Sequence, residues 1–225
     1  MKDKIIEGTV KEAGEKGLYI IYAQLRRGGK ITEEFNRAKN KTRLNTFSIS
    51  KSFVSAGIGI AMDEGLLTMD ERICDAFEEY VPSNASKNLL DTRVRHMLTM
   101  TTGLNEPLFF ADGPERYKVK DWIAHFFNAE FGHAPGERFL YSNFNTYILS
   151  CLVEKRAGVN LLEYLRDRLL EPLGIGNPDW TLCPKGHVHA ANGLYLNIDE
   201  LGNFGDMLLH YGEYKGKQLV PEKYL

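Results

Sequence analysis

The sequence predicts a mostly helical fold of the α+β class, and three observations lead to this prediction. Residues 17–35 have the composition of a β-hairpin, whereas later segments carry apolar residues at helical spacing between helix-capping residues. With 225 residues, the chain is long enough to bury a full core in one domain, or in one domain with a lobe inserted into it.

The predicted hairpin lies near the N-terminus. Residues 17–25 are rich in aromatic and β-branched types, which favour strands. Residues 26–29, Arg-Arg-Gly-Gly, supply a turn, and residues 30–35 follow as the second strand. The polar segment 36–46 is expected to be a loop that leads into the first long helix.

That helix is expected to begin within residues 47–53, Phe-Ser-Ile-Ser-Lys-Ser-Phe, because the apolar run of residues 54–62 follows at once. Nearly all side chains from Phe53 to Met62 are apolar or small, which indicates a helix that is buried on all sides. Gly65 stands just beyond, where a left-handed helix cap is expected.

Caps and apolar spacing predict the later helices. A capping box at residues 68–71 opens a short helix that ends before Pro82, and Asn160 and Asn197 each begin another helix. Further helices are expected over residues 92–100, 121–128 and 142–158. Four large side chains in the second of these lie at helical spacing and indicate core rather than a cofactor site: Trp122, Ile123, Phe126 and Phe127.

Charge and composition exclude several classes of partner. The 28 basic and 30 acidic residues nearly balance and form no long block of one sign, so we expect neither nucleic acid nor a membrane as partner. The cysteines, three in number and in no C-x-x-C pair, indicate free thiols in a reducing compartment. Because the N-terminus lacks the apolar segment of a signal peptide, a cytoplasmic location is expected.

Ser48 and Lys51 form the strongest candidate for catalytic chemistry. They stand three residues apart, so they share one face if the segment is helical. A serine hydroxyl becomes a good nucleophile when a neighbouring base takes its proton, and a lysine with a lowered pKa can be that base. This S-x-x-K spacing occurs in serine hydrolases, but it also fits an ordinary helix start capped by Ser48 or Ser50.

Histidine offers two other candidate sites, and both are weaker. His96 lies with two arginines on a predicted helix, which we interpret as a solvated or paired face. His187 and His189 stand two residues apart in a loop without a third ligand nearby, whereas protein-bound zinc takes three or four protein ligands. We therefore expect no metal site.

The end of the sequence reads as the first turn of a helix, with Pro221 at its favoured first position. One turn cannot offset the cost of helix nucleation, and a single two-stranded hairpin is marginally stable in water. We therefore expect the chain to lack C-terminal strands.

Four motifs follow one another in order: FSISKSF at 47–53, DEGLL at 63–67, RHMLTMTTGL at 95–104 and PGERFLYSN at 135–143. Together they resemble the serine β-lactamase and penicillin-binding protein superfamily, on the side of class C β-lactamases, D-alanyl-D-alanine carboxypeptidases and esterases. The similarity runs from about residue 17 to the end.

The resemblance implies an α/β sandwich with an inserted helical lobe, the β-lactamase/transpeptidase-like fold. A single domain over residues 1–225 would then hold three parts. The N-terminal hairpin and the Ser48 helix would occupy 17–66, a mostly helical lobe about 67–190, and an incomplete return toward the sheet 191–225.

The resemblance also implies a role for each site residue. Ser48 resembles the acylated nucleophile and Lys51 the group that polarises it. Tyr141 resembles a phenol that shuttles the proton to the leaving group, and Asn143 the amide that hydrogen-bonds Lys51 and the substrate. The expected chemistry is two acyl-transfer steps on a lactam, peptide or ester, with a small-molecule or peptidoglycan-like substrate and without cofactor or metal.

Two departures qualify this expectation. Tyr195 and Asn197 repeat the Y-x-N spacing, but Asn197 reads as a helix cap and no Pro-Gly precedes Tyr195. The family's third motif is missing, because no K-S-G or K-T-G occurs and His210-Tyr211-Gly212 reads as the end of a helix. We therefore expect a fragment or degenerate relative of an active hydrolase, or else a non-catalytic binding protein, whose exposed sheet edge invites self-association.

Overall fold

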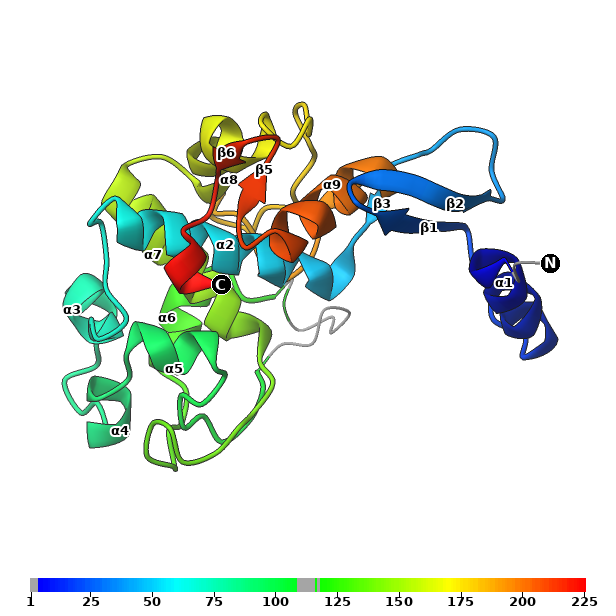
Figure 1. Ribbon diagram of the computed structural model, residues 1–225. Coiled ribbons are helices and arrows are strands. Elements are labelled where there is room, and N and C mark those ends of the chain that lie inside the picture. Colours follow the sequence, from blue (N-terminus) through cyan, green and yellow to red (C-terminus); the bar gives the residue numbers. More distant parts are fainter. Residues whose placement is uncertain (1–3, 109–115, 117) are drawn as a thin grey trace.

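The computed structural model describes residues 4–108, 116 and 118–225. Its helices form a body around two central helices, and a β-hairpin with its own helix extends from one end of that body (Figure 1). The predicted α+β class is therefore confirmed. No helix within the described ranges is long and apolar enough to cross a membrane.

The two central helices are α2 (Ser50–Asp63) and α7 (Asn143–Ala157), and they pack against each other. α2 is buried from Phe53 through most of its length, and α7 is buried at every position from Phe144 to Val153. For α2, such burial on all sides is what the apolar run after Ser48 predicts. The bounds of α7 agree with the expected helix over residues 142–158, since the Ser142 hydroxyl accepts from the Phe144 N–H at its start and Gly158 ends it with φ 74°.

Shorter helices surround this pair. α5 (Val94–Leu98) packs on α7, and α6 (Trp122–Phe127) buries the four large side chains expected in the core. α9 (Ile198–Leu209) starts at the predicted Asn197 cap. The remaining helical elements are α3 (Ile73–Ala76), η2 (Glu78–Tyr80), α4 (Lys87–Leu90), α8 (Leu161–Leu165), η4 (Arg166–Leu170) and η5 (Glu222–Tyr224).

Three helix predictions need correction. The expected capping box at residues 68–71 forms a turn, and α3 begins only at Ile73. The helix expected to begin at Asn160 is α-helical for five residues and then widens into the π-helical turn η4. Pro221 precedes the 3-10 turn η5 rather than opening an α-helix.

The described strands pair into three antiparallel two-stranded sheets. The predicted hairpin is β1 (Tyr22–Arg27) with β2 (Lys30–Asn36), and its turn lies at Gly28 and Gly29, both with positive φ. β3 (Leu44–Asn45) pairs with β4 (Tyr195–Leu196), so the expected loop 36–46 contains a short strand. β5 (Glu213–Tyr214) pairs with β6 (Lys217–Gln218).

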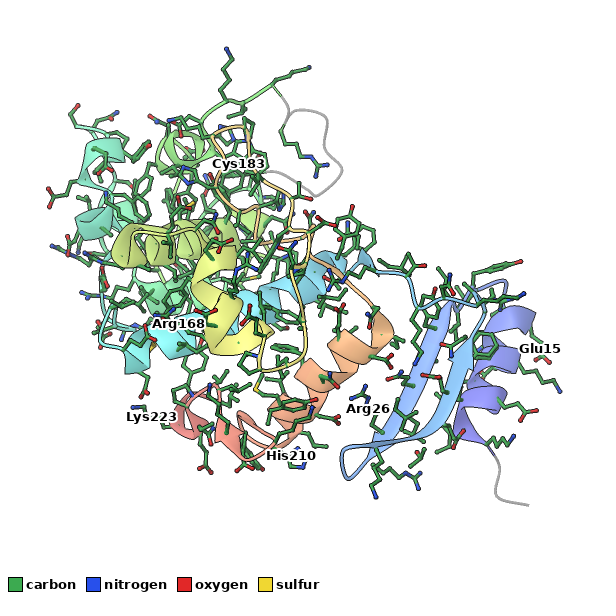
Figure 2. The ribbon with its side chains drawn as sticks, turned by 90° about the horizontal axis from the view of Figure 1, so that it is seen from above. Glu15, Arg26, Arg168, Cys183, His210 and Lys223 are labelled. Carbon is green, nitrogen blue, oxygen red and sulfur yellow. The ribbon has the colours of Figure 1, made fainter. Side chains whose placement is uncertain are left out.

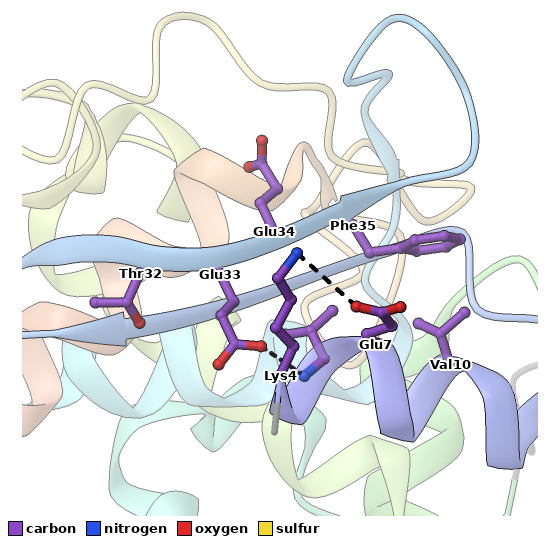
Figure 3. Close-up of a pocket in the computed structure, with 8 residues that line it drawn as sticks. Lys4, Glu7, Val10, Thr32, Glu33, Glu34 and Phe35 are labelled. Atoms are coloured by element: carbon purple, nitrogen blue, oxygen red, sulfur yellow. Dashed lines mark hydrogen bonds and ion pairs between the residues drawn. The ribbon is translucent and has the colours of Figure 1, made fainter. Parts of the chain in front are cut away.

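The N-terminal helix α1 (Ile5–Glu15) was not predicted from the sequence. None of its residues is buried, because it rests on β2 over an open groove rather than on the core (Figure 3). Lys4, Glu7 and Val10 line one wall of the groove, and residues 32–35 line the other. The Ile6 N–H donates to Glu33 Oε2 at 2.9 Å, which ties the start of α1 to the strand.

The three cysteines are buried and unpaired, which confirms the prediction of free thiols. Burial raises the pKa of the Cys74 thiol to about 11, so this thiol is protonated at neutral pH. The same cause raises the pKa of the Cys151 thiol above its usual range. These side chains therefore act as small apolar groups in the core.

Replacing Gly103 by alanine is expected to cost about 2–4 kcal/mol of stability. Gly103 has φ 89°, and a Cβ placed there would lie 2.1 Å from the His133 carbonyl oxygen. Gly65 is the matched control, because it also has positive φ (73°) but a Cβ there would meet nothing within 4 Å. Gly65→Ala should therefore cost only about 1 kcal/mol. Urea denaturation measures both, and equal costs would contradict the clash.

Candidate active site

A strained turn presents Ser48 at the mouth of α2. The turn is a 3-10 segment, η1 (Phe47–Ile49), and Phe47 in it has φ 46°, a left-handed conformation that is unfavourable for an aromatic residue. Asn45 Oδ1 accepts from the Phe47 N–H at 2.9 Å, and the Ser50 hydroxyl donates to the Phe47 carbonyl at 2.6 Å. These bonds hold the turn in a conformation that leaves Ser48 exposed.

Lys51, the second residue of α2, reaches back to Ser48. Its Nζ donates to Ser48 Oγ at 3.0 Å and to the Ala191 carbonyl at 2.7 Å. Burial lowers the pKa of the Lys51 ammonium, and this effect outweighs the opposing interaction with Tyr141. A larger fraction of this amine is therefore neutral, and able to accept a proton, than for a lysine in water.

Tyr141 comes from the loop before α7, 93 residues from Ser48, yet its hydroxyl donates to Ser48 Oγ at 2.8 Å. Backbone hydrogen bonds support this loop, because Gly136 N–H donates to the Thr101 carbonyl and Leu140 N–H to the Met100 carbonyl. Burial would raise the pKa of the Tyr141 phenol, but the hydrogen bonds with Lys51 and Ser48 lower it below its ordinary value. A proton can therefore pass between serine, phenol and amine at modest cost.

Asn143, the predicted substrate amide, is the partly buried first residue of α7. Among the described residues, Lys51 donates to Ser48 Oγ and to the Ala191 carbonyl, and the expected hydrogen bond from Lys51 to Asn143 stays a prediction. The position of Asn143, two residues after Tyr141, still places it beside the loop that carries the phenol. Its role toward a substrate stays a prediction.

Tyr195 and Asn197, the second Y-x-N pair, have structural roles. Asn197 Oδ1 accepts from the Asp199 and Glu200 N–H groups and caps α9, as predicted. Tyr195 lies in β4, opposite Asn45 on β3. The H-x-G sequence at residues 210–212 ends a helix, as predicted, because His210 Nδ1 lies 2.7 Å from the Asp206 carbonyl at the end of α9 and Gly212 follows with φ 89°.

The histidines form no metal site in the described ranges, where no group of three potential ligands lies together. His96 Nδ1 accepts from the Arg93 N–H at the start of α5. His187 Nδ1 lies 3.0 Å from Glu154 Oε1. His189 is buried, with its ring edge-on to Trp122 at 5.1 Å.

Two contributors to the site were missed from the sequence. Asn45 Oδ1 accepts from both the Phe47 N–H and the Gly193 N–H, so it joins the Ser48 turn to the segment that carries Ala191. The Ala191 carbonyl fixes the position of Lys51 Nζ. A main-chain acceptor has no side-chain signature, whereas an asparagine two residues before a turn is a recognisable local signal.

Comparison with known proteins identifies a family and individual relatives that match most of this chain. The profile of the family described as Beta-lactamase matches residues 3–214. Penicillin-binding protein 4* of Bacillus subtilis is 24% identical over 201 residues, which cover 85% of this chain and 42% of that protein. A second curated relative, from Alkalihalophilus pseudofirmus, is covered over 59% of its length, so the chain spans about half the length of these relatives.

Solved structures share the fold at low sequence identity. The octameric penicillin-binding protein homologue from Pyrococcus abyssi superposes with a TM-score of 0.72 at 20% identity, covering 97% of this chain and 58% of that one. A D-stereospecific amidohydrolase from Streptomyces superposes with a TM-score of 0.69 at 21% identity, covering 90% and 70%. At such identities the likeness concerns the fold alone.

Proposed function

The chain belongs to the Beta-lactamase family, and on that premise we propose that it is a serine hydrolase in which Ser48 is acylated by a lactam, peptide or ester. One observation carries the proposal: an amine and a phenol from helix openings far apart in the sequence both donate to the same serine oxygen. The names of the similar proteins, a penicillin-binding protein and an amidohydrolase, agree with acyl-transfer chemistry.

In the proposed acylation step, Ser48 Oγ attacks the carbonyl carbon of the substrate while its proton passes to Lys51 Nζ or to the Tyr141 phenolate. The tetrahedral intermediate then collapses, the bond to the leaving group breaks, and Tyr141 returns the proton to that group. This leaves an ester on Ser48. In the second step water attacks the ester carbonyl, the bond between the acyl carbon and Ser48 Oγ breaks, and the acid product leaves while the same side chains carry the proton of the water to Ser48 Oγ.

The geometry suits a proton relay. Lys51 Nζ lies 3.0 Å and Tyr141 Oη 2.8 Å from Ser48 Oγ, and both distances are within the reach of direct proton transfer. Lys51 Nζ also lies 5.0 Å from the centre of the Tyr141 ring, so its charge favours the phenolate. Asn143 is proposed to hold a polar group of the substrate at the same opening.

Activity-based labelling tests this function. The protein is incubated with a fluorescent fluorophosphonate and, separately, with a fluorescent penicillin, and the modified residue is located by mass spectrometry. We expect label on Ser48 with at least one probe and none on Ser48→Ala. Ser52→Ala is the matched control, because Ser52 is an exposed serine one turn along α2, and it should label normally. Label that survives in Ser48→Ala would contradict the proposal.

The alternative, a non-catalytic binding protein, is favoured by the missing third motif, since the H-x-G sequence at residue 210 ends α9. Turnover distinguishes the two functions. If this chain slowly hydrolyses a chromogenic ester and Ser48→Ala does not, the binding protein is excluded. If the folded chain gives neither turnover nor label, the binding protein is the better description.

A further inference from the structure

A pocket of about 380 Å³ opens beside Phe47, in the turn that carries Ser48. Phe47, which immediately precedes Ser48, forms one wall, and Asn192, which follows the carbonyl that holds Lys51, forms another. The pocket is therefore continuous with the turn that presents the proposed nucleophile. A volume of this size accommodates a small organic group.

One part of the pocket wall is apolar. Phe47 and Trp122 contribute aromatic surface, and Leu182 and Pro184 contribute aliphatic surface. Phe47 and Leu182 remain largely exposed, so apolar area is available to a ligand. Such a wall favours an aromatic or aliphatic group, because its transfer out of water is favourable.

His189 is the most deeply buried of the polar residues in this wall, which also include Asn45, Arg116, Thr181 and Asn192. It is only 6% exposed, and its ring packs edge-on against Trp122 at an interplanar angle of 85°. Its Nδ1 is sealed from solvent and has no hydrogen-bond partner among the described residues. A buried polar atom without a partner costs stability, so a purely structural role would be met better by an apolar residue.

The electrostatic surroundings keep this imidazole neutral. Burial lowers the pKa of His189 to about 4, and the positive charges of Arg116 and Lys51 act in the same direction. A neutral imidazole carries one N–H and one acceptor nitrogen. Since only Nδ1 is sealed, a proton on Nε2 leaves the lone pair at Nδ1 and places the N–H where a ligand in the pocket can reach it.

We propose that His189 is a specificity-determining residue, which donates a hydrogen bond to an acceptor oxygen on an otherwise apolar acyl group in this pocket. The substrate class is then an ester or amide whose acyl chain combines an aromatic or aliphatic body with a ketone, ether or amide oxygen. This inference rests on the proposed acylation of Ser48, which places the acyl chain beside Phe47.

The test measures binding in Ser48→Ala, so that no acylation takes place. Methyl 4-oxo-4-phenylbutanoate and methyl 4-phenylbutanoate differ only by a ketone in place of a methylene. Longer homologues of each vary the distance between the ester group and that position. Isothermal titration compares the two series. We expect the best ketone to bind about three- to tenfold more tightly than its methylene partner, as one neutral hydrogen bond allows.

The variant His189→Phe keeps a flat ring against Trp122 and removes both nitrogens. In the Ser48→Ala background it should bind ketone and methylene esters equally. His187→Gln is the matched control, because His187 pairs with Glu154 and does not line the pocket, and it should keep the preference for the ketone. A ketone preference that persists in His189→Phe, or its absence from the parent throughout the series, would overturn the proposal.

A second measurement keeps His189 in place, so its result does not depend on whether the His189→Phe variant folds. The ¹⁵N resonances of the His189 ring are recorded in Ser48→Ala with each ester. The ketone, unlike the methylene analogue, should shift the Nε2 signal, and identical spectra would count against the hydrogen bond. If Ser48 is not labelled, the proposed acylation is wrong. If Ser48 is labelled but the ketone and methylene esters bind with equal affinity, only the role of His189 is wrong.

Discussion

Replacing Lys51 by arginine is expected to slow acylation of Ser48 by about 10²–10⁴-fold, the range that a positioned general base contributes. Arginine keeps the positive charge, but its guanidinium does not lose a proton in proteins and cannot accept one from Ser48. The first-order rate of fluorophosphonate labelling measures the change. Circular dichroism verifies that the variant is folded, and a labelling rate equal to that of the parent would contradict the role of Lys51.

The pH dependence of this rate follows from the lowered pKa of Lys51. The rate should rise as pH rises through that pKa, because the neutral amine is the base, and the rise should lie below pH 10.5, the value of an unperturbed lysine. Tyr141 also has a lowered pKa, so the two groups titrate as a coupled pair. Tyr141→Phe separates them: if the rising limb persists, Lys51 is the base, and if it disappears, the phenolate is.

The Ser48–Lys51 pair and Tyr141 could each be picked out from the sequence. The local sequence pattern did not predict that these two parts of the site lie in contact. The Ser48–Lys51 contact follows from a spacing of three residues, although Ser48 lies in the 3-10 turn rather than in α2. Tyr141 stands 93 residues away from Ser48. Periodicity and caps do not specify such a distance, and only the resemblance of ordered motifs implied that the two would meet.

The features that the sequence did not predict have weak local signals. β3 and β4 contain two residues each, too short for an alternating pattern, and they exist because the segment before Ser48 pairs with residues 195–196. α1 has a short apolar stripe of Ile6, Val10 and Ala13, but it is interrupted by two glycines and none of its residues is fully buried. The π-helical turn η4 preserves the apolar sequence of an ordinary helix, so its widening follows from tertiary packing rather than from composition.

Removal of Arg26 is expected to have the largest effect on how the hairpin is attached to the body. Arg26 lies on β1 at the contact with α9 (Figure 2). Its Nη1 donates to Asp206 Oδ2 at 2.7 Å and to Asn203 Oδ1 at 2.9 Å, and the side chains of Arg26 and Asp206 are only 14% and 10% exposed. Arg26→Ala should cost about 3–5 kcal/mol, because it leaves the Asp206 carboxylate buried without its cation.

Hydrogen exchange measures where this cost falls. Peptides that cover β1 and β2 should lose protection in Arg26→Ala, while α7 in the body keeps its protection, because the hairpin depends on α9 for its attachment. Uniform loss of protection would instead mean that Arg26 stabilises the whole chain.

The double variant Arg26→Met/Asp206→Leu separates the loss of attraction from the penalty of an unpaired charge. A buried ion pair offsets its own desolvation only in part, so two apolar side chains of similar size can replace it at little cost. The double variant should therefore retain more hairpin protection than either Arg26→Met or Asp206→Leu alone. If its loss equals the sum of the two single losses, the residues act independently and the pair is not the attachment point. Gly202 supports the paired geometry, since a Cβ there would lie 2.4 Å from the Arg26 guanidinium carbon, and α9 therefore accommodates the arginine where it has no side chain.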